Sequence, residues 1–274
     1  MSRQGQDYPT ESESRALFVE LGRRLYQRGF VAANDGNISV RLSPDWILAT
    51  PTGVSKGFMS VDQMVLVNLV NGEWKGILKP STEIRMHRAI YLARHDVRAV
   101  VHAHPPIATA FSVAGIPLDQ SILAEVIVSI GTIPIAEYHT PSTQEFADHV
   151  AYCIQKYEAI LLANHGAVTV GKDLEQAFFR METLEHYAHI SWIVRQLGSE
   201  NVLSFNQVRE LMALRSMYGL QPPAPDCLTC PNYQKPTEER QNEETVSASQ
   251  ESSSLNKQTI ETIVRAVLRQ LETS

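Results

Sequence analysis

Two histidines one residue apart, His102 and His104, close a mostly apolar run over residues 97–101 and are followed by two prolines. The run predicts a buried strand, in which residues i and i+2 point to the same face. Both imidazoles can therefore reach a single metal ion. The same spacing also fits a half-buried polar pair on a strand, so a metal site requires a further ligand.

His165 is a third candidate ligand. It ends a second apolar run over residues 159–164 and is followed at once by Gly166. Two strand ends can converge on one pocket, and three neutral nitrogen ligands with an open fourth position are typical of a catalytic zinc site. The other histidines fall within or beside predicted helices, where surface or core packing is the default: His87, His95, His139, His149, His186 and His189.

A base is needed near such a metal, and residues 79–87 predict the start of a helix just upstream. Its first turn would hold Ser81, Thr82 and Glu83. Hydroxyls and free backbone N–H groups at a helix N-terminus bind phosphate, because the unpaired donors and the helix dipole both favour an anion. An acid in a first turn also stabilises helices by about 0.3–1 kcal/mol, so position alone does not make Glu83 catalytic.

Two turns carry glycines: residues 34–37 precede a predicted strand at 38–41, and residues 50–53 follow one at 46–49. Both turns are compatible with ordinary hairpins. Neither fits a Walker loop or a dinucleotide fingerprint, since residues 53–57 have the wrong glycine spacing. A nucleotide cofactor is therefore not indicated.

Five short motifs, taken in chain order, resemble the class II aldolase family of fuculose phosphate aldolases and ribulose-phosphate 4-epimerases. They lie at residues 36–41, 50–53, 80–83, 101–104 and 164–166, and the resemblance covers roughly residues 12–220. It implies a zinc-dependent, commonly tetrameric α/β protein. Its fold would be a central, largely antiparallel sheet flanked by helices.

The resemblance also implies roles for particular residues. His102, His104 and His165 would hold the zinc ion, and Glu83 would be the acid/base. The epimerase branch carries an aspartate in place of Glu83, so the match favours the aldolases. The residues implied to cradle or flank the substrate phosphate are Asn37, Gly53, Ser81 and Thr82, with Gly36 and Thr52 beside them.

Further along, residues 217–220 resemble the C-terminal Tyr-Gly-Leu of the fuculose phosphate aldolases, whose tyrosine reaches a neighbouring subunit's site. Tyr218 would then move a proton at the aldehyde-side oxygen. Those aldolases carry another active-site tyrosine, whereas residues 121–126 contain none and place Leu123 or Glu125 in that region. This departure leaves the aldehyde preference open, with proton transfer by Glu125 as an alternative.

Composition bounds the partners and the compartment. The 274 residues are 43% hydrophobic with a formal net charge of -6, so the chain can bury a sizeable core, and nucleic acid is not expected as a partner. No run approaches the roughly 20 apolar residues that cross a bilayer. Residues 1–14 have no signal-peptide core, and a cytoplasmic protein is expected. Cys153 is expected in the core. A lone Cys-x-x-Cys, at Cys227 and Cys230, is only a weak signal for a zinc knuckle or a redox couple.

The pattern predicts one α/β catalytic domain over residues 1–221. Its first helix starts at a capping box formed by Thr10 and Glu13 and stops at Gly29. Further helices are expected at residues 81–94, 142–156 and 173–197, with short strands between them.

The composition changes after Leu220. Residues 222–254, rich in Pro, Glu, Gln and Ser, predict a disordered, flexible linker. Residues 255–274 then predict an amphipathic helix with apolar residues on one face. A linker followed by such a helix resembles the encapsulation peptides that bring enzymes into bacterial microcompartments; docking on the parent domain is the alternative. The mixed polar face argues against membrane binding.

Together these features predict a zinc-dependent enzyme that reversibly cleaves a ketose 1-phosphate to dihydroxyacetone phosphate and an aldehyde. L-Fuculose 1-phosphate, which gives lactaldehyde, is the preferred substrate. A homotetramer in the lumen of a bacterial microcompartment, bound to a shell protein through residues 255–274, is expected. The alternatives are a sugar-phosphate 4-epimerase or dehydratase on the same scaffold, and a non-catalytic interaction module.

Overall fold

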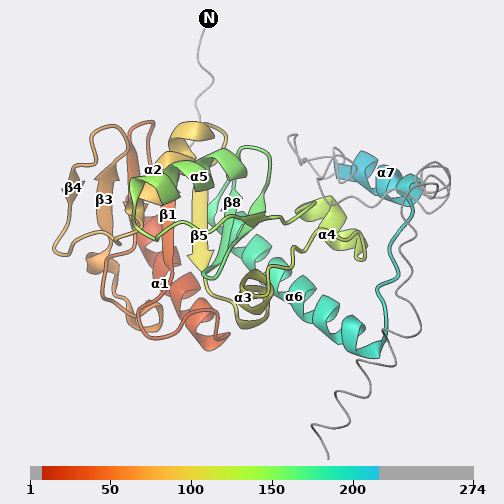
Figure 1. The fold of residues 1–274 in the computed structure, drawn as a ribbon. Coiled ribbons are helices and arrows are strands. Elements are labelled where there is room, and N and C mark those ends of the chain that lie inside the picture. The colour runs from red at the N-terminus through yellow and green to blue at the C-terminus, as the bar shows by residue number, and fades with distance from the viewer. Residues whose placement is uncertain (1–7, 216–274) are drawn as a thin grey trace, which may run out of the picture. The chain divides into compact units, whose positions relative to one another are not determined.

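A computed structural model describes residues 8–215 of the chain, which form a central sheet covered by helices on both faces (Figure 1). The spatial strand order is β4-β3-β2-β1-β5-β8-β7-β6. Every neighbouring pair in this sheet is antiparallel except β6 and β7, which are parallel. The strands are β1 (Asn37–Arg41), β2 (Trp46–Ala49), β3 (Val65–Asn68), β4 (Trp74–Lys75), β5 (Ala99–Ala103), β6 (Ile135–Ala136), β7 (Ala159–Leu162) and β8 (Gly166–Gly171). The predicted α/β fold with a largely antiparallel sheet is confirmed.

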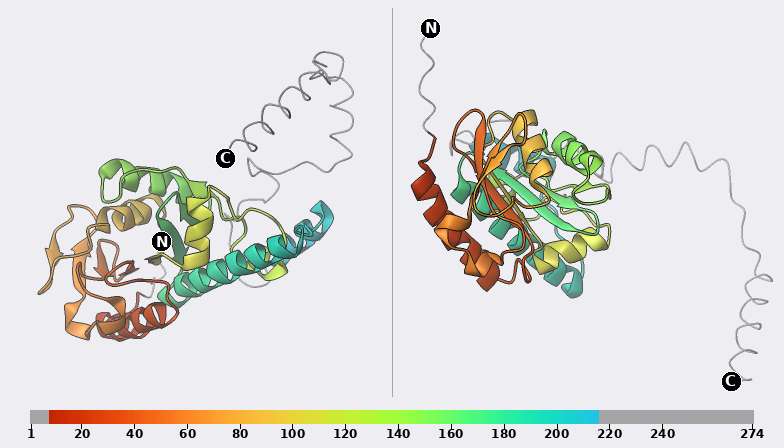
Figure 2. Two further views of the ribbon diagram at one scale, coloured as in Figure 1. Left: turned by 60° about the horizontal axis from the view of Figure 1, so that its bottom comes forward. Right: turned by 90° about the vertical axis from the view of Figure 1, so that its left-hand side faces the viewer.

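The helices divide between the two faces of the sheet, as the two views of Figure 2 show. One hydrophobic core lies beneath α1 (Glu11–Gln27), α3 (Pro106–Val113), α4 (Ala124–Ser129) and α6 (Leu174–Leu197). The other lies beneath α2 (Ile84–Ala93) and α5 (Gln144–Ile154), which pack side by side. Helix α7 (Phe205–Leu214) packs on α4, and two 3-10 turns, η1 (Lys56–Phe58) and η2 (Val61–Gln63), lie near α1.

Alternation along β1 assigns its side chains to the two faces. Ile38 and Val40 belong to the core under α1 and α6. Asn37, Ser39 and Arg41 therefore point toward α2, because successive strand residues face opposite sides. All five residues of β1 are buried. A buried strand thus presents a polar stripe to one helix, and these polar groups need partners.

The helices expected at residues 10–29, 142–156 and 173–197 are confirmed, with ends within two residues of those predicted. Helix α1 starts after Thr10, whose hydroxyl accepts from the Glu13 backbone N–H while the Glu13 carboxylate accepts from the Thr10 backbone. Helix α6 starts after Asp173, whose carboxylate accepts from the Gln176 N–H. Cys153 is half-buried on α5 beside the core under α2 and α5.

The predicted start of α2 is wrong by three residues. The helix begins at Ile84, so Ser81 and Thr82 lie in a turn before it and Glu83 is the residue at its boundary. The Ser81 N–H donates to the carbonyl of Thr50 at 3.2 Å, which ties this turn to the end of β2. The Glu83 side chain makes no hydrogen bond that caps α2.

Several sequence predictions lie outside the described residues. Backbone contacts divide the chain into Met1–Asn232 and Tyr233–Ser274, and the described residues all belong to the first unit. Residues outside 8–215 are not described, which leaves out Tyr218, the Cys227–Cys230 pair, the linker at 222–254 and the helix at 255–274. Within residues 8–215, no helix has the length and apolarity that a membrane crossing requires.

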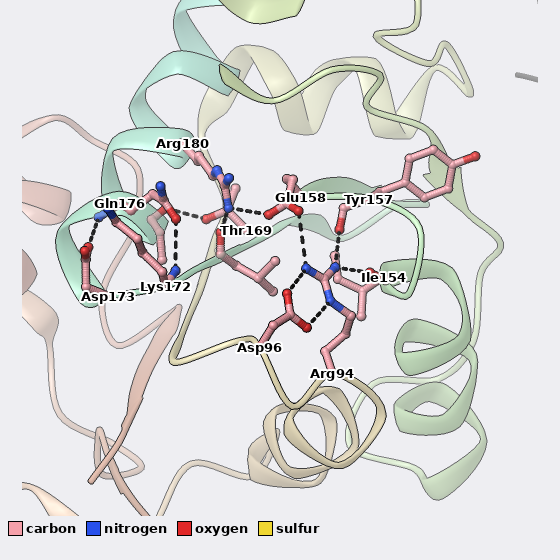
Figure 3. Close-up of polar contacts among 12 residues, drawn as sticks. Arg94, Asp96, Ile154, Tyr157, Glu158, Thr169, Lys172, Asp173, Gln176 and Arg180 are labelled. Atoms are coloured by element: carbon pink, nitrogen blue, oxygen red, sulfur yellow. Dashed lines mark hydrogen bonds and ion pairs between the residues drawn. The ribbon is translucent and has the colours of Figure 1, made fainter. Parts of the chain in front are cut away.

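A buried ionic cluster joins helices from the two faces of the sheet to the start of β7 (Figure 3). Glu158, just before β7, pairs with Arg94 at the end of α2 at 3.3 Å and with Arg180 of α6. Arg94 also donates to the carbonyls of Ile154 and Tyr157, and pairs with the exposed Asp96. Glu158, Arg94 and Arg180 are all buried, so their charges depend on one another for compensation.

Substitution of Glu158 should destabilise the fold. Glu158→Gln removes the anion between two buried guanidinium groups, and we expect a loss of about 3 kcal/mol in the free energy of unfolding. The matched control is Asp96→Asn, which removes an exposed partner of Arg94 and should cost about 1 kcal/mol or less. Urea denaturation measures both, and equal losses would contradict the assigned role of Glu158.

Candidate active site

Three imidazoles meet at one end of the sheet. His102 lies in β5, His104 follows that strand, and His165 lies in the turn between β7 and β8. The three ring centroids are 4.8–5.0 Å apart, and one nitrogen from each ring lies within 4.8 Å of the others. The cluster predicted from the sequence therefore exists in the fold, and it could bind a metal ion.

Strand pairing brings the third ring to the first two. β5 pairs with β8 along its whole length, with Ala103 opposite Ala167, so the β7–β8 turn lies beside the end of β5. Gly166 permits this approach, because a Cβ there would lie 2.5 Å from the Ala103 carbonyl oxygen and 2.6 Å from the His104 ring. Asn164 completes the turn in a left-handed conformation with φ 56°.

Protonation of the rings suits metal binding. His102 Nδ1 lies 2.9 Å from the Ala167 carbonyl oxygen and so carries the proton, which leaves the Nε2 lone pair facing the cluster. Burial lowers the pKa of His165 to about 3, whereas at His102 the Glu83 carboxylate outweighs burial and raises the pKa. Burial also lowers the pKa of His104. The rings of His165 and His104 are neutral at pH 7, the form that ligates a metal.

Glu83 reaches into the same cluster. Its Oε2 lies 3.3 Å from His102 Nε2, and its Oε1 lies 3.4 Å from His165 Nε2. Burial favours the neutral acid, but the interactions with His102, His165 and Asn37 outweigh it and hold the pKa of Glu83 below its usual range. The residue is therefore a buried carboxylate directed at the imidazoles, and not the capping acid of a helix.

Two buried polar atoms within this cluster have no hydrogen-bond partner: Glu83 Oε1 and His165 Nδ1. Buried polar atoms are nearly always satisfied by protein, water or an ion. An anionic oxygen beside three neutral imidazoles is also the donor set that a divalent cation prefers. The residues present therefore fit a metal ion.

The residues implied to bind phosphate come from segments that lie side by side. Pro51 and Pro80 form an isolated β-bridge, and the Thr52 N–H donates to the Lys79 carbonyl at 3.0 Å. The turn containing Thr52 and Gly53 therefore lies beside the turn containing Ser81 and Thr82. Of these four residues, Thr52, Gly53 and Thr82 are exposed, which leaves them accessible to a ligand.

Gly36 and Asn37 complete this surrounding shell. Gly36 has φ +71°, and a Cβ there would lie 2.9 Å from the His102 carbonyl oxygen, so the turn closes tightly against β5. The Asn37 amide nitrogen donates to Glu83 Oε2 at 2.7 Å and to Ser81 Oγ at 3.3 Å. In this arrangement Asn37 contacts the acid as well as the turn assigned to phosphate.

Other residues of the site were missed from the sequence. Asp35 Oδ2 lies 3.4 Å from His104 Nδ1 and orients that ring. His87, assigned to packing, is buried but also contacts the Asn37 side chain. Its spacing was the available signal, because residue i+4 of a helix lies on the same face as residue i, here Glu83.

Lys56 was also missed. Its side chain is buried, and its ammonium donates to the carbonyls of Asn34 at 3.0 Å and Val54 at 2.7 Å. Burial lowers the pKa of Lys56 to about 8, against the opposing charge of Asp35. The lysine therefore ties together the two glycine turns that flank the site.

Two predicted contributors have no described contact with this cluster. Glu125 is exposed in the first turn of α4. Tyr218 lies outside the part of the chain that the structure describes. Their roles stay predictions.

Residues 16–192 match the family described as the Class II Aldolase and Adducin N-terminal domain. The match covers the whole sheet and the whole histidine cluster, and the chain belongs to this family.

Relatives in the family carry more than one activity name. A protein from Pectobacterium atrosepticum named 3-oxo-tetronate 4-phosphate decarboxylase is 35% identical, over 74% of this chain and 94% of its own length. A protein from Methanococcus maripaludis named L-fuculose phosphate aldolase is also 35% identical, over 66% of this chain and 97% of its own. Both names refer to phosphorylated sugar derivatives.

Similar solved structures also carry more than one activity name. YgbL from Klebsiella pneumoniae, whose description leaves aldolase, epimerase and decarboxylase open, matches with a TM-score of 0.69 and 32% identity, covering 74% of this chain and 99% of that one. A structure described as L-fuculose 1-phosphate aldolase matches with a TM-score of 0.69 and 27% identity, covering 76% and 98%.

Removal of one imidazole should abolish metal binding. We expect the wild-type protein to hold roughly one metal ion per chain and His104→Ala to hold almost none after dialysis, because two nitrogens do not complete such a site. His95→Ala is the matched control, since His95 is exposed at the end of α2. Plasma mass spectrometry measures the metal content; equal content in the two variants would contradict the assignment.

Proposed function

We propose that the protein is a zinc-dependent aldolase that reversibly cleaves a ketose 1-phosphate to dihydroxyacetone phosphate and an aldehyde. L-Fuculose 1-phosphate, which gives lactaldehyde, is the proposed substrate. The observation that carries the proposal is the position of Glu83, whose two carboxylate oxygens lie 3.3 and 3.4 Å from two of the three clustered imidazoles. The L-fuculose phosphate aldolase names among the relatives support it.

The proposed chemistry follows from the charge that the reaction creates. Breaking the bond next to a ketone leaves negative charge on carbon and the ketone oxygen. Zinc held by His102, His104 and His165 would supply Lewis-acid stabilisation of that charge. In cleavage the hydroxyl that becomes the aldehyde oxygen would lose its proton, with Tyr218 as the proposed relay, and Glu83 would deliver a proton to the carbon. Condensation would reverse both transfers.

The turns around the histidine cluster would orient the substrate. The exposed Thr52, Gly53 and Thr82, together with Ser81 and the Gly36–Asn37 turn, would hold the phosphate group. Bound phosphate fixes the distance between the reacting carbon and Glu83, which turns a bimolecular encounter into an oriented one.

A second candidate is decarboxylation of a 3-oxo-tetronate 4-phosphate. Relatives with that name align over about three quarters of this chain. Loss of carbon dioxide next to a ketone also leaves negative charge on carbon, so the same metal and acid would serve it. Residues 121–126 lack the second active-site tyrosine of the fuculose phosphate aldolases, and this departure supports the second candidate.

Product analysis separates the candidates. We expect zinc-dependent release of dihydroxyacetone phosphate from fuculose 1-phosphate, measured by coupled reduction, with rhamnulose and ribulose 1-phosphates as competitors. Carbon dioxide release from 3-oxo-tetronate 4-phosphate alone would replace the aldolase by the decarboxylase. Conversion of ribulose 5-phosphate would support the epimerase, a dehydrated product would support the dehydratase, and a metal-free protein without turnover would support an interaction module.

Glu83→Gln tests the acid/base assignment. The amide keeps the shape of the side chain but transfers no proton, so we expect kcat to fall by about 10²–10⁴. Zinc content should stay near the wild-type value. Near-normal cleavage by this variant would remove Glu83 from the proton transfer.

The assembly is proposed on sequence grounds. We place the enzyme as a homotetramer in a bacterial microcompartment, with Tyr218 reaching a neighbouring subunit's site and residues 255–274 bound to a shell protein. The apolar stripe of this segment and the polar linker before it support the proposal.

Deletion of residues 255–274 tests the targeting proposal. We expect unchanged kcat in free solution and loss of co-sedimentation with shells, because the stripe would contact the shell and not the catalytic domain. The matched comparison is the full-length chain with Ile263→Asp and Val267→Asp, which should also stay outside shells. A large loss of activity in the truncated protein would indicate docking on the parent domain.

A further inference from the structure

A chain of buried hydrogen bonds runs from Glu83 into the interface between α2 and β1. Asn37 Nδ2 donates to Glu83 Oε2 at 2.7 Å, and the Asn37 amide oxygen is hydrogen-bonded to His87 Nε2. His87 Nδ1 lies 2.6 Å from Ser39 Oγ, which lies 2.9 Å from the Tyr91 hydroxyl. Each of these five side chains is buried.

The direction of each bond follows from the Glu83 carboxylate, which only accepts: the NH₂ end of Asn37 faces Glu83 Oε2, so the amide oxygen faces His87. An amide oxygen only accepts, so His87 Nε2 must carry the proton that it gives to Asn37. Burial lowers the pKa of His87 to about 3, so the ring is neutral and its Nδ1 has a free lone pair. Ser39 must then donate to Nδ1, and Tyr91 can donate to Ser39. Along this series of hydrogen bonds, each donor therefore faces an acceptor.

The hydrogen bond from His87 also holds the Asn37 amide in this orientation. The two ends of an amide have nearly the same shape, and only hydrogen-bond partners distinguish them. A donor at His87 Nε2 selects the oxygen end, so the NH₂ end must face Glu83 and Ser81. Glu83 Oε2 is thereby held, while Oε1 keeps no hydrogen-bond partner and remains directed at the imidazoles.

We propose that His87, hydrogen-bonded through Nδ1 to Ser39, is a positioning residue that orients Asn37 and so presents Glu83 Oε1 to the reacting centre. The proposal deepens the proposed function, because it rests on Glu83 as the acid/base. It assigns a chemical task to a histidine that packing alone would not require. A leucine could fill the same space in the core under α2 and α5.

Kinetics provides the first test, with whichever substrate the wild-type protein turns over. Ser39→Ala and His87→Leu should lower kcat by about 10- to 100-fold, as loss of an orienting partner commonly does, while KM and zinc content change little. His87→Gln should recover much of the loss, because glutamine can donate to Asn37 and accept from Ser39.

Ser14→Ala is the matched control for Ser39→Ala. Ser14 is equally buried, but its hydroxyl has no hydrogen-bond partner and it lies in α1 on the opposite face of the sheet. It should leave kcat unchanged. If Ser39→Ala behaves like Ser14→Ala, or if His87→Gln is no better than His87→Leu, the proposal is overturned.

A second readout does not depend on activity, so it separates failure of this proposal from failure of the proposed function. Nitrogen-15 spectra of histidine-labelled, zinc-loaded protein, assigned by difference against His87→Gln, report the tautomer of His87. We expect the Nε2–H form at pH 7, and a shift of the ring signals in Ser39→Ala but not in Ser14→Ala. An Nδ1–H or doubly protonated ring in the wild-type protein would refute the proposed orientation.

Discussion

The antiparallel register of β1, β5 and β8 is the constraint on which the site depends. Asn37 of β1 lies opposite His102 of β5, which in turn lies opposite Val168 of β8. A shift of one residue in either ladder would turn these side chains to the opposite face. The register therefore determines at once that the first imidazole, the amide beside Glu83 and the turn carrying His165 share one end of the sheet.

That register costs folding free energy, because it buries polar side chains of β1 in the core under α2. Ser39 is fully buried, and so is His87 opposite it. The cost is offset only because these groups satisfy one another and end at functional residues. Helix α2 thus reaches the histidine cluster in two ways: its boundary residue is Glu83, and His87 on its buried face is hydrogen-bonded to Asn37.

The sequence predicted the parts of this arrangement that have short-range signals. Spacing identified His102 and His104, and a capping box located the start of α1. The start of α2 was misplaced because a bridge between Pro51 and Pro80, distant in sequence, holds residues 81–83 outside the helix. His87, Lys56 and the Arg94–Glu158–Arg180 cluster were missed for a related reason: the partners cited here lie 22 to 64 residues away in the sequence, so only the fold brings them together.

Backbone ladders also determine when the histidine cluster can form. His102 and His104 are carried by β5, and His165 by the turn that closes the β7–β8 hairpin. Main-chain hydrogen bonds hold these positions, so the three rings converge only once the β5–β8 ladder has formed. Affinity alone discriminates poorly among divalent transition ions at such a cluster. An ion bound there would therefore reflect the supply surrounding the folded chain, which would make the place and time of folding part of the chemistry of the protein.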